Sequence, residues 1–183
     1  MRLDLDWVTP LLAIGGSFPV EAAEHLAREL GVRHVVDLRV EDRDDEVALR
    51  RHGIELLHLP TRDVCAVSLP MLEEGVRWVS ERLERGGKVY VHCEHGIGRS
   101  ALLAVCVLSA AGDPPLQALA RAKGARRCVS PSPDQLEAFR AWLSRRPVRG
   151  GEQVDVPSFE ALASIAYAHL RDPGPEGDVR RSG

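Results

Sequence analysis

One stretch of the sequence combines a nucleophile with a backbone suited to binding anions. Residues 91–100 read VHCEHGIGRS, and the apolar residues before Cys93 predict a strand that ends there. Gly96 and Gly98 would let the following backbone turn tightly and approach a ligand closely. A strand, a glycine-bearing loop and a helix form a recurrent anion cradle, because backbone N–H groups point inward and the helix N-terminus adds positive potential.

Arg99 stands where the next helix is predicted to begin. Its forked guanidinium could bind two oxygens of one phosphate. Positive surroundings of this kind stabilise a thiolate. The Cys93 sulfur would then lie beneath a bound phosphate, in line to attack phosphorus. The spacing therefore predicts phosphoryl transfer to sulfur. The plain alternatives are a buried structural thiol for Cys93 and a surface ion pair for Arg99.

The segment 92–100 follows the pattern H-C-x-x-G-x-x-R-S. It resembles the signature loop of cysteine-dependent protein tyrosine phosphatases, and the chain is most similar to their small dual-specificity branch. The similarity covers about residues 5–145. It includes an early strand with Trp7, the stretch VVDLR at 35–39, and PSPDQL at 131–136.

The resemblance implies roles for the loop residues. Cys93 would form a phosphocysteine intermediate and Arg99 would hold the phosphate. Ser100 would hydrogen-bond the sulfur and help it leave when water attacks. The residues expected to bind substrate are Glu94, His95, Gly96, Ile97, Gly98 and Arg99. We expect no metal and no cofactor.

The leaving oxygen needs a proton, so the reaction requires a carboxylic acid on a separate loop. In the family an aspartate about thirty residues before the cysteine supplies it. Asp63 lies thirty positions before Cys93 and follows the extended segment LHLPTR. We therefore assign Asp63 as the acid. Asp37 is the competing candidate, but it falls within a predicted strand.

Several polar neighbours of the loop have two interpretations. His92 either supports the loop through a backbone hydrogen bond or also tunes the thiol, and Gln135 either caps its helix or orients water. Glu94 would place a negative charge at the mouth of a phosphate site, so we expect it to face outward as scaffold. His95 could contact substrate. The acidic run 41–46 is expected to be a solvated loop.

Strand and helix signals alternate along the chain. The predicted strands are 11–16, 32–40, 54–59 and 88–93, and the predicted helices are 20–30, a short one ending at Gly53, 70–85, 100–111, 114–122 and 132–143. Such alternation predicts an α/β fold with a central, mostly parallel sheet flanked by helices.

The C-terminal part is expected to add to this domain. We predict one extra helix at 157–170, after a linker at Gly150 and Gly151. The resulting division is a phosphatase domain at 1–147, a linker and an additional helix packing on it at 148–171, and a disordered tail at 172–183.

Composition and charge narrow the class of protein. The chain has 183 residues, 44% of them hydrophobic, which is enough for the core of one domain. A net charge of -3 gives no sign of a nucleic-acid or membrane binder. No apolar run approaches the ~20 residues of a membrane span. The start, MRLDLDWVTP, does not resemble a signal peptide, so a cytoplasmic location is expected.

Cysteine usage points the same way. The four cysteines, at 65, 93, 106 and 128, are scattered without metal-binding spacing, and we expect free thiols. Cys65, two residues beyond Asp63, is a candidate for a reversible disulfide with Cys93.

These patterns predict an enzyme that hydrolyses phosphate monoesters. The favoured substrate is a phosphotyrosine protein or peptide, with phosphoserine and phosphothreonine as further candidates. Glu94 and Ile97 stand where phosphoinositide-preferring relatives tend to carry lysines, which disfavours a highly charged inositol lipid. The alternatives are a phosphatase of a small metabolite, a catalytically idle phospho-binding module, and sulfur transfer or arsenate reduction. The oligomeric state is not predicted.

Overall fold

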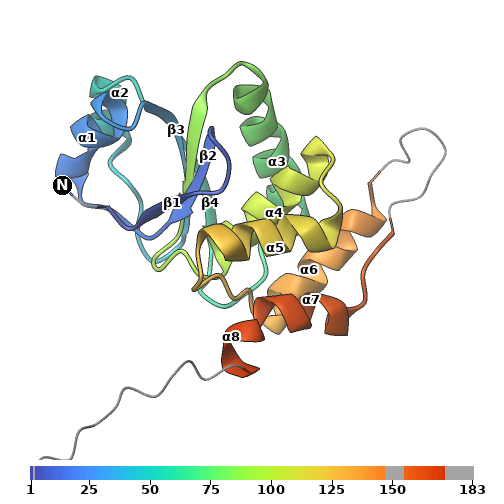
Figure 1. Cartoon of the computed structure of the whole chain (residues 1–183). Coiled ribbons are helices and arrows are strands. Elements are labelled where there is room, and N and C mark those ends of the chain that lie inside the picture. The colour runs from blue at the N-terminus through green and yellow to red at the C-terminus, as the bar shows by residue number, and fades with distance from the viewer. Residues whose placement is uncertain (2, 147–154, 172–183) are drawn as a thin grey trace, which may run out of the picture.

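In the computed structural model a five-stranded sheet lies between two layers of helices (Figure 1). The structure describes residues 1, 3–146 and 155–171. The strands are β1 (Leu5–Trp7), β2 (Leu12–Gly15), β3 (Val32–Arg39), β4 (Glu55–Thr61) and β5 (Lys88–His92). The helices are α1 (Ala23–Arg28), preceded by a 3-10 turn, α2 (Glu46–Arg51), α3 (Leu69–Glu84), α4 (Arg99–Ala111), α5 (Pro115–Ala125), α6 (Pro133–Ser144), α7 (Phe159–Ala166) and α8 (Ala168–Arg171).

The sheet has the strand order β1-β2-β5-β3-β4. The four strands β2, β5, β3 and β4 run parallel, while the short edge strand β1 is antiparallel to β2. The predicted α/β fold with a mostly parallel sheet is confirmed. In such open sheets, ligands bind outside the carboxyl ends of the strands, where successive connections leave in opposite directions. β5 occupies the centre, and Cys93 follows its carboxyl end.

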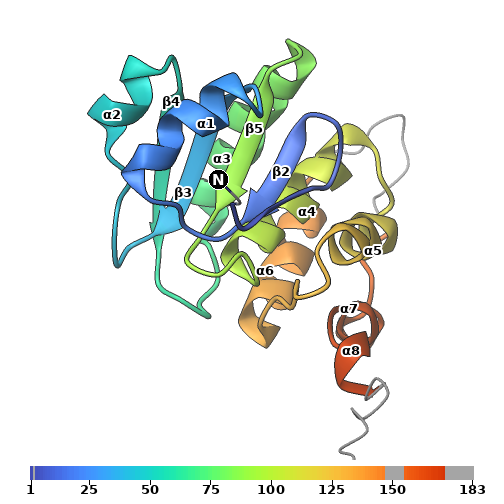
Figure 2. The same cartoon turned by 60° about the vertical axis from the view of Figure 1, so that its left-hand side comes forward.

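Alternation along the strands explains why helices cover both faces. Val35 and Tyr90 belong to the core beneath α1 and α2, whereas their neighbours Val36 and Val91 belong to the larger core beneath the later helices. Successive side chains of a strand point to opposite faces, so apolar runs produce two cores. Figure 2 shows α1 and α2 in front of the sheet and α3 behind it.

Helix α4 lies at the centre of the larger layer. Eleven of its thirteen residues are buried, and it contacts the sheet as well as α3, α5 and α6. A helix that is apolar on all sides needs such surroundings. Because packing fixes α4 on every side, its N-terminus is held in place directly after the glycine-bearing loop.

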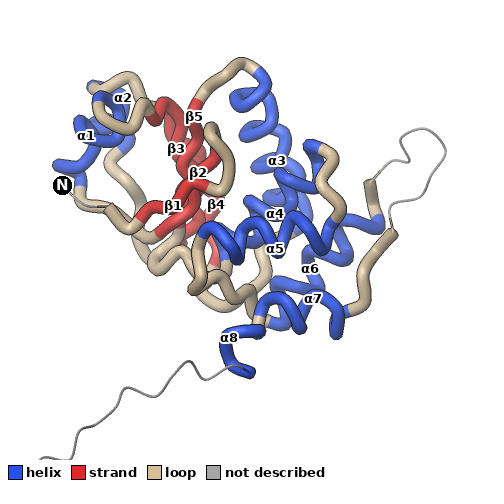
Figure 3. Tube along the Cα trace, viewed as in Figure 1, coloured by secondary structure: helices blue, strands red, loops and turns tan. Residues whose placement is uncertain are grey.

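The predicted C-terminal helix is two helices, α7 and α8, separated at Tyr167. Leu162 and Ala166 of α7 are fully buried in the larger core, and α7 packs on α5 and α6 (Figure 3). The predicted linker glycines and the predicted disordered tail lie outside the described residues. Of the helices in the described ranges, none has the length and apolarity needed to cross a bilayer.

Candidate active site

Cys93 lies at the base of a small cavity. The cavity measures about 130 Å³. We call it the Cys93 cavity, and the other residues that line it are Asp63, Val64, His95, Ile97, Gly98, Ser130, Ser132 and Gln135. Cys93 is 3% exposed, and its Sγ lies 3.5 Å from Oγ of Ser100 in the first turn of α4. The sulfur is thus within hydrogen-bond reach of the hydroxyl that was predicted to assist it.

The loop after Cys93, residues 94–98, turns its carbonyl groups outward. These carbonyls accept hydrogen bonds of 2.9–3.0 Å from outside the loop: Glu94 from the Ser17 amide, His95 and Gly96 from the Arg126 guanidinium, and Ile97 from the Ser130 amide. In a trans peptide unit the C=O and the N–H point in opposite directions. The N–H groups of residues 95–98 therefore point away from those donors, toward the side that lines the Cys93 cavity. Converging amides of this kind attract anions.

Glycine is required at position 96. Gly96 has φ +65°, and a Cβ there would lie 2.4 Å from the carbonyl carbon of Gly15. Both the left-handed backbone and the close approach to β2 exclude larger residues. The tight turn of the loop thus depends on this residue.

Arg99 is the most deeply held cation of the site, at 1% exposure. Its Nη1 donates to the Thr61 carbonyl at 2.8 Å, and Nη1 and Nη2 donate to the two carboxylate oxygens of Glu41 at 2.9 and 2.7 Å. Burial alone would lower the pKa of Arg99, but the hydrogen bonds to Glu41 and the charge of Cys93 raise it, so the cation persists.

The Nε of Arg99 is buried without a hydrogen-bond partner among the described residues. A buried unpaired donor costs about 1–3 kcal/mol, so such groups need an explanation. A bound oxyanion would supply the missing acceptor.

The acidic run 41–46 is solvated in part, as expected, since Glu41, Asp42, Arg43 and Asp45 are exposed, but two of its acids also pair with buried arginines. Glu41 pairs with Arg99 from 58 residues away, and the Asp44 side chain is only 4% exposed. Asp44 accepts hydrogen bonds from Arg39 and from His92, both at 2.8 Å. Charge composition alone did not identify these partners, because the arginines lie on β3 and at the start of α4.

His92 supports the loop from below. It is fully buried, its Nε2 bonds Asp44, and its Nδ1 lies 3.4 Å from the Cys93 carbonyl oxygen. Asp37, the competing acid, is buried and bound by Arg39 at 3.0 Å. Burial would raise the pKa of Asp37, but hydrogen bonds from Arg39 and the nearby His92 lower it. Asp37 is not among the residues that line the Cys93 cavity.

These three groups also satisfy a distance test for metal ligands. Oxygen atoms of Asp37 and Asp44 and a ring nitrogen of His92 lie within 4.8 Å of one another. Arg39 donates to both carboxylates, at 3.0 Å to Asp37 and 2.8 Å to Asp44. A guanidinium thus already binds both carboxylates, and the cluster contacts the loop through His92, whose Nδ1 lies 3.4 Å from the Cys93 carbonyl oxygen.

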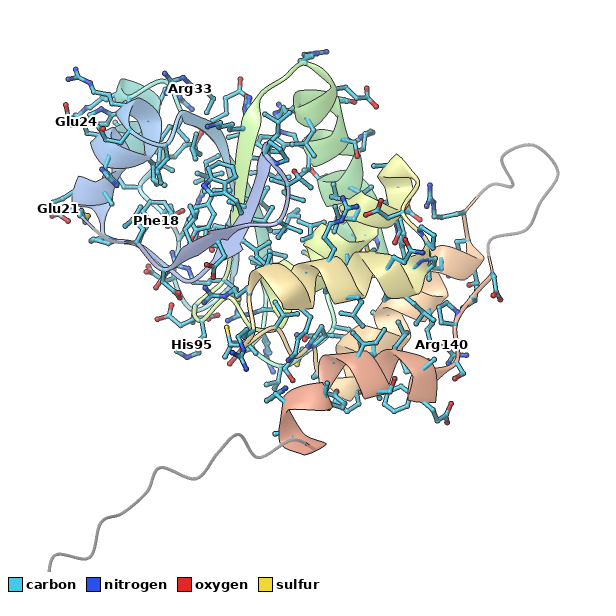
Figure 4. The ribbon with its side chains drawn as sticks, viewed as in Figure 1. Phe18, Glu21, Glu24, Arg33, His95 and Arg140 are labelled. Carbon is cyan, nitrogen blue, oxygen red and sulfur yellow. The ribbon has the colours of Figure 1, made fainter. Side chains whose placement is uncertain are left out.

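The two exposed polar residues of the loop differ in position. The Glu94 carboxylate lies 3.4 Å from Nη1 of Arg39 and is 42% exposed, so its charge is directed at an arginine and not at the sulfur. His95 lines the mouth of the Cys93 cavity. Figure 4 shows it at the lower edge of the domain.

Asp63 reaches the site from the loop after β4. Its carboxylate lies 3.2 Å from Nη2 of Arg99, and its side chain is 62% exposed. The next residue, Val64, has φ +55°, a left-handed conformation that is strained for a β-branched side chain. The loop is held in this form from α6, where Ser132 donates to the Val64 carbonyl at 2.7 Å and Gln135 donates to the Cys65 carbonyl at 3.0 Å.

Gln135 caps its helix, as one of its two predicted interpretations has it. It completes a capping box with Ser132, and it also lines the Cys93 cavity. All four cysteines are free, with Cys65 exposed.

Comparison with known proteins identifies the family. The family model "Polymorphic toxin system, DSP-PTPase phosphatase" matches residues 14–113, more than half of the chain. The chain belongs to this family. The resemblance to the dual-specificity branch of the cysteine-dependent tyrosine phosphatases is thereby confirmed.

The individual relatives of this DSP-PTPase phosphatase carry different names. The phosphatidylglycerophosphate phosphatase PTPMT1 of Arabidopsis thaliana is 30% identical over 96 residues, which are 51% of this chain and 28% of that protein. The chain thus spans under a third of the length of that curated relative. The chain is also similar to Tk-PTP, whose crystal structure is of the active form. The two sequences are 27% identical, the TM-score is 0.73, and the match covers 80% of this chain and all of Tk-PTP.

Human DUSP28 shares the fold of this DSP-PTPase phosphatase. The two chains are 24% identical with a TM-score of 0.67, covering 78% of this chain and 94% of DUSP28. At this identity the likeness concerns the fold alone.

Sequence reasoning missed several residues that support the site. Arg126 bonds two loop carbonyls, and Glu41 and Asp44 bond Arg99 and His92. No local pattern marks Arg126 within ARRCVS. The alternation of acids with arginines at 39–46 was a signal for Glu41 and Asp44, but it does not reveal partners distant in sequence.

Replacing Gly96 with alanine tests the required turn. We expect Gly96→Ala to abolish binding of vanadate, a tetrahedral oxyanion, because the new Cβ collides with the backbone of Gly15. Gly124→Ala on α5 is the matched control, since a Cβ there meets nothing within 4 Å. That variant should bind vanadate as before and gain up to about 1 kcal/mol of stability. Isothermal titration calorimetry measures the affinities, and tight binding by Gly96→Ala would contradict the prediction.

The Glu41–Arg99 pair predicts a titration. The hydrogen bonds from Arg99 lower the pKa of Glu41 from 4.5 to about 2. Because the folded-state pKa is depressed, the pair's contribution to stability is complete above pH 4.5 and is lost as the pH falls toward 2. In Arg99→Lys, which cannot make two parallel hydrogen bonds, the Glu41 midpoint seen by NMR should rise toward 4.5.

The internal control for this titration is Asp4. Its pKa is lowered by a hydrogen bond from Arg126, which the substitution does not change. Asp4 should therefore keep its depressed midpoint in Arg99→Lys. An unmoved Glu41 midpoint would show that Arg99 is not the cause.

Proposed function

We propose that the chain hydrolyses phosphate monoesters at the Cys93 cavity through a phosphocysteine intermediate, with protein phosphotyrosine as the substrate class. The supporting observation is that two segments distant in sequence bring Asp63 and Cys93 to one cavity, with the Asp63 carboxylate 3.2 Å from Nη2 of Arg99. A nucleophile, a cation for the phosphate and an acid for the leaving group are the groups that such a reaction needs.

In the first step the Cys93 thiolate attacks phosphorus and the bond to the ester oxygen breaks. The loop amides and Arg99 bind the oxygens of the transferred phosphoryl group, where they stabilise its charge. Asp63, protonated in this step, gives its proton to the leaving oxygen. The products are a free hydroxyl group and phosphocysteine.

In the second step water attacks phosphorus and the sulfur–phosphorus bond breaks. The Asp63 carboxylate takes a proton from that water, which restores the acid for the next cycle. The Ser100 hydroxyl, 3.5 Å from the sulfur, donates a hydrogen bond to the thiolate as it leaves. Inorganic phosphate is released and Cys93 returns to its initial state.

The walls of the cavity support an aromatic substrate. Val64 and Ile97 line it and are 67% and 38% exposed, so they offer apolar surface beside the sulfur. A phosphotyrosine ring could pack there while its phosphate reaches Cys93. Residues 94–98 contain no lysine, and the Glu94 carboxylate faces Arg39, so nothing within that loop matches additional phosphates.

A second candidate is a phospholipid monoester. The observation that favours it is the 30% identity to the phosphatidylglycerophosphate phosphatase PTPMT1 of Arabidopsis thaliana. Such a substrate also carries a single terminal phosphate monoester, so the same chemistry would apply. The two candidates differ in what surrounds the phosphate, which a substrate panel can separate.

The panel tests the proposal directly. We expect turnover of a phosphotyrosine peptide to exceed that of a phosphoserine peptide, phosphatidylglycerophosphate vesicles and a sugar phosphate by about tenfold or more in kcat/KM. Cys93→Ser should bind phosphate without turnover, because its hydroxyl is a poor nucleophile. Fastest hydrolysis of the lipid would replace the protein substrate with the second candidate. Binding without turnover by the unaltered chain would indicate an idle phospho-binding module.

Substitution of the assigned acid gives a second test. Asp63→Asn should lower kcat for a phosphotyrosine peptide by about a hundredfold or more, but should slow p-nitrophenyl phosphate much less, because nitrophenolate leaves without a proton. Asp155→Asn, at an exposed position, is the control and should behave like the unaltered chain. Equal slowing of both substrates by Asp63→Asn would show that the acid is another residue.

A further inference from the structure

A short segment lies between the loop 94–98, which we call the phosphate-binding loop, and the C-terminal helices, and it contacts both. We call residues 126–132 the bracing segment. On its first side, Arg126 donates from Nε to the Gly96 carbonyl and from Nη2 to the His95 carbonyl, both at 2.9 Å, and the Ser130 amide donates to the Ile97 carbonyl at 2.9 Å. These are three of the four outward bonds that turn the loop's amides toward the Cys93 cavity.

Helices α5 and α7 hold the other side of the bracing segment. The Tyr167 hydroxyl donates to the Pro131 carbonyl at 2.7 Å. The Lys123 ammonium donates to the Val129 carbonyl at 2.7 Å and to the Ala166 carbonyl at 2.9 Å, which ties the segment and the end of α7 to one cation.

Packing reinforces these polar bonds. Val129 of the bracing segment is fully buried in the same core cluster as Leu162 and Ala166 of α7. The segment therefore lies between two layers of contacts and has little room to shift independently of α7.

Arg126 is itself fixed at its far end. It is 6% exposed, and it pairs with Asp4 at 2.7 Å and with Asp6 at 2.8 Å, on and beside β1. A planar guanidinium with five donors can satisfy two carboxylates and two carbonyls only in one orientation. A shift of the bracing segment would therefore move Arg126, and with it the loop carbonyls that Arg126 binds.

This support lies beyond the family match. The match to the DSP-PTPase model ends at residue 113, before the bracing segment and before α7. The structural match to Tk-PTP covers all of Tk-PTP but only 80% of this chain. The contribution of α7 is therefore not accounted for by the part of the chain that defines the family.

We infer that α7 acts through the bracing segment to hold the phosphate-binding loop in its anion-binding form. Tyr167 and Lys123 are the positioning residues of this arrangement. The inference rests on the proposed function in one respect, that the loop around Cys93 binds a phosphate oxyanion.

The test compares Tyr167→Phe with Ser164→Ala. Both lose one hydroxyl hydrogen bond on α7, but the Ser164 bond, to the Ala161 carbonyl, stays within the helix. We expect the Kd of vanadate to rise about threefold to tenfold in Tyr167→Phe, the range of one ordinary hydrogen bond, and to stay unchanged in Ser164→Ala. Lys123→Met is the second variant on the same support and should weaken vanadate binding in the same direction.

A second readout separates positioning of the loop from a general loss of stability. Iodoacetate and iodoacetamide both alkylate thiolates, but only iodoacetate carries a charge that the loop amides attract. We expect Tyr167→Phe to lower the ratio of the iodoacetate rate to the iodoacetamide rate at Cys93. Peptide mass spectrometry follows Cys93 separately, because the exposed Cys65 and Cys128 are alkylated as well. Partial unfolding alone would raise both rates.

The outcomes distinguish this inference from the proposed function. The role of α7 would be overturned if Tyr167→Phe and Lys123→Met both matched the unaltered chain in vanadate affinity and in alkylation ratio. This holds even if the enzyme is fully active. Absence of turnover in the unaltered chain would overturn the proposed function, while a weakened vanadate site in Tyr167→Phe would still support the bracing role.

Discussion

The direction of four peptide groups determines what this site can do. Residues 94–97 direct their carbonyls outward to donors on Ser17, Arg126 and Ser130, so the amides that follow them face the Cys93 cavity. An amide nest gains its affinity for anions from this common orientation, not from net charge. The chain as a whole carries a charge of -3, yet the backbone of this loop has the geometry that suits an anion.

Charges around the nest are arranged to keep its cation available. Glu41 binds one edge of the Arg99 guanidinium, and Nε has no partner among the residues that the structure describes, so the arginine is oriented before any ligand arrives. A second arginine, Arg39, forms ion pairs with the nearby carboxylates of Asp37, Asp44 and Glu94. Preorganisation of this kind is what makes electrostatic stabilisation effective, because little reorganisation is left for the reaction itself.

The sequence was a good guide to the parts of the site that depend on local order. Strand, glycine loop and helix follow one another directly, so Cys93 and Arg99 were singled out by their spacing. The resemblance to the family added Ser100, and alternating periodicity predicted the parallel sheet. Arg126 and Glu41 could not be found in this way. Each contacts the site across 30 residues or more, and neither the sequence around Arg126 nor the acidic run that contains Glu41 reveals a partner so distant in sequence.

The reach of Arg126 has a consequence for the order of folding. It joins carboxylates near the chain start to loop carbonyls in the middle, over separations as large as 122 residues. Contacts so distant in sequence form late, because the entropy of closing a long loop must first be overcome. During synthesis, Cys93 leaves the ribosome well before residue 126 can join β1 to the loop. The His95 and Gly96 carbonyls therefore gain their Arg126 donors only after most of the chain has been synthesised.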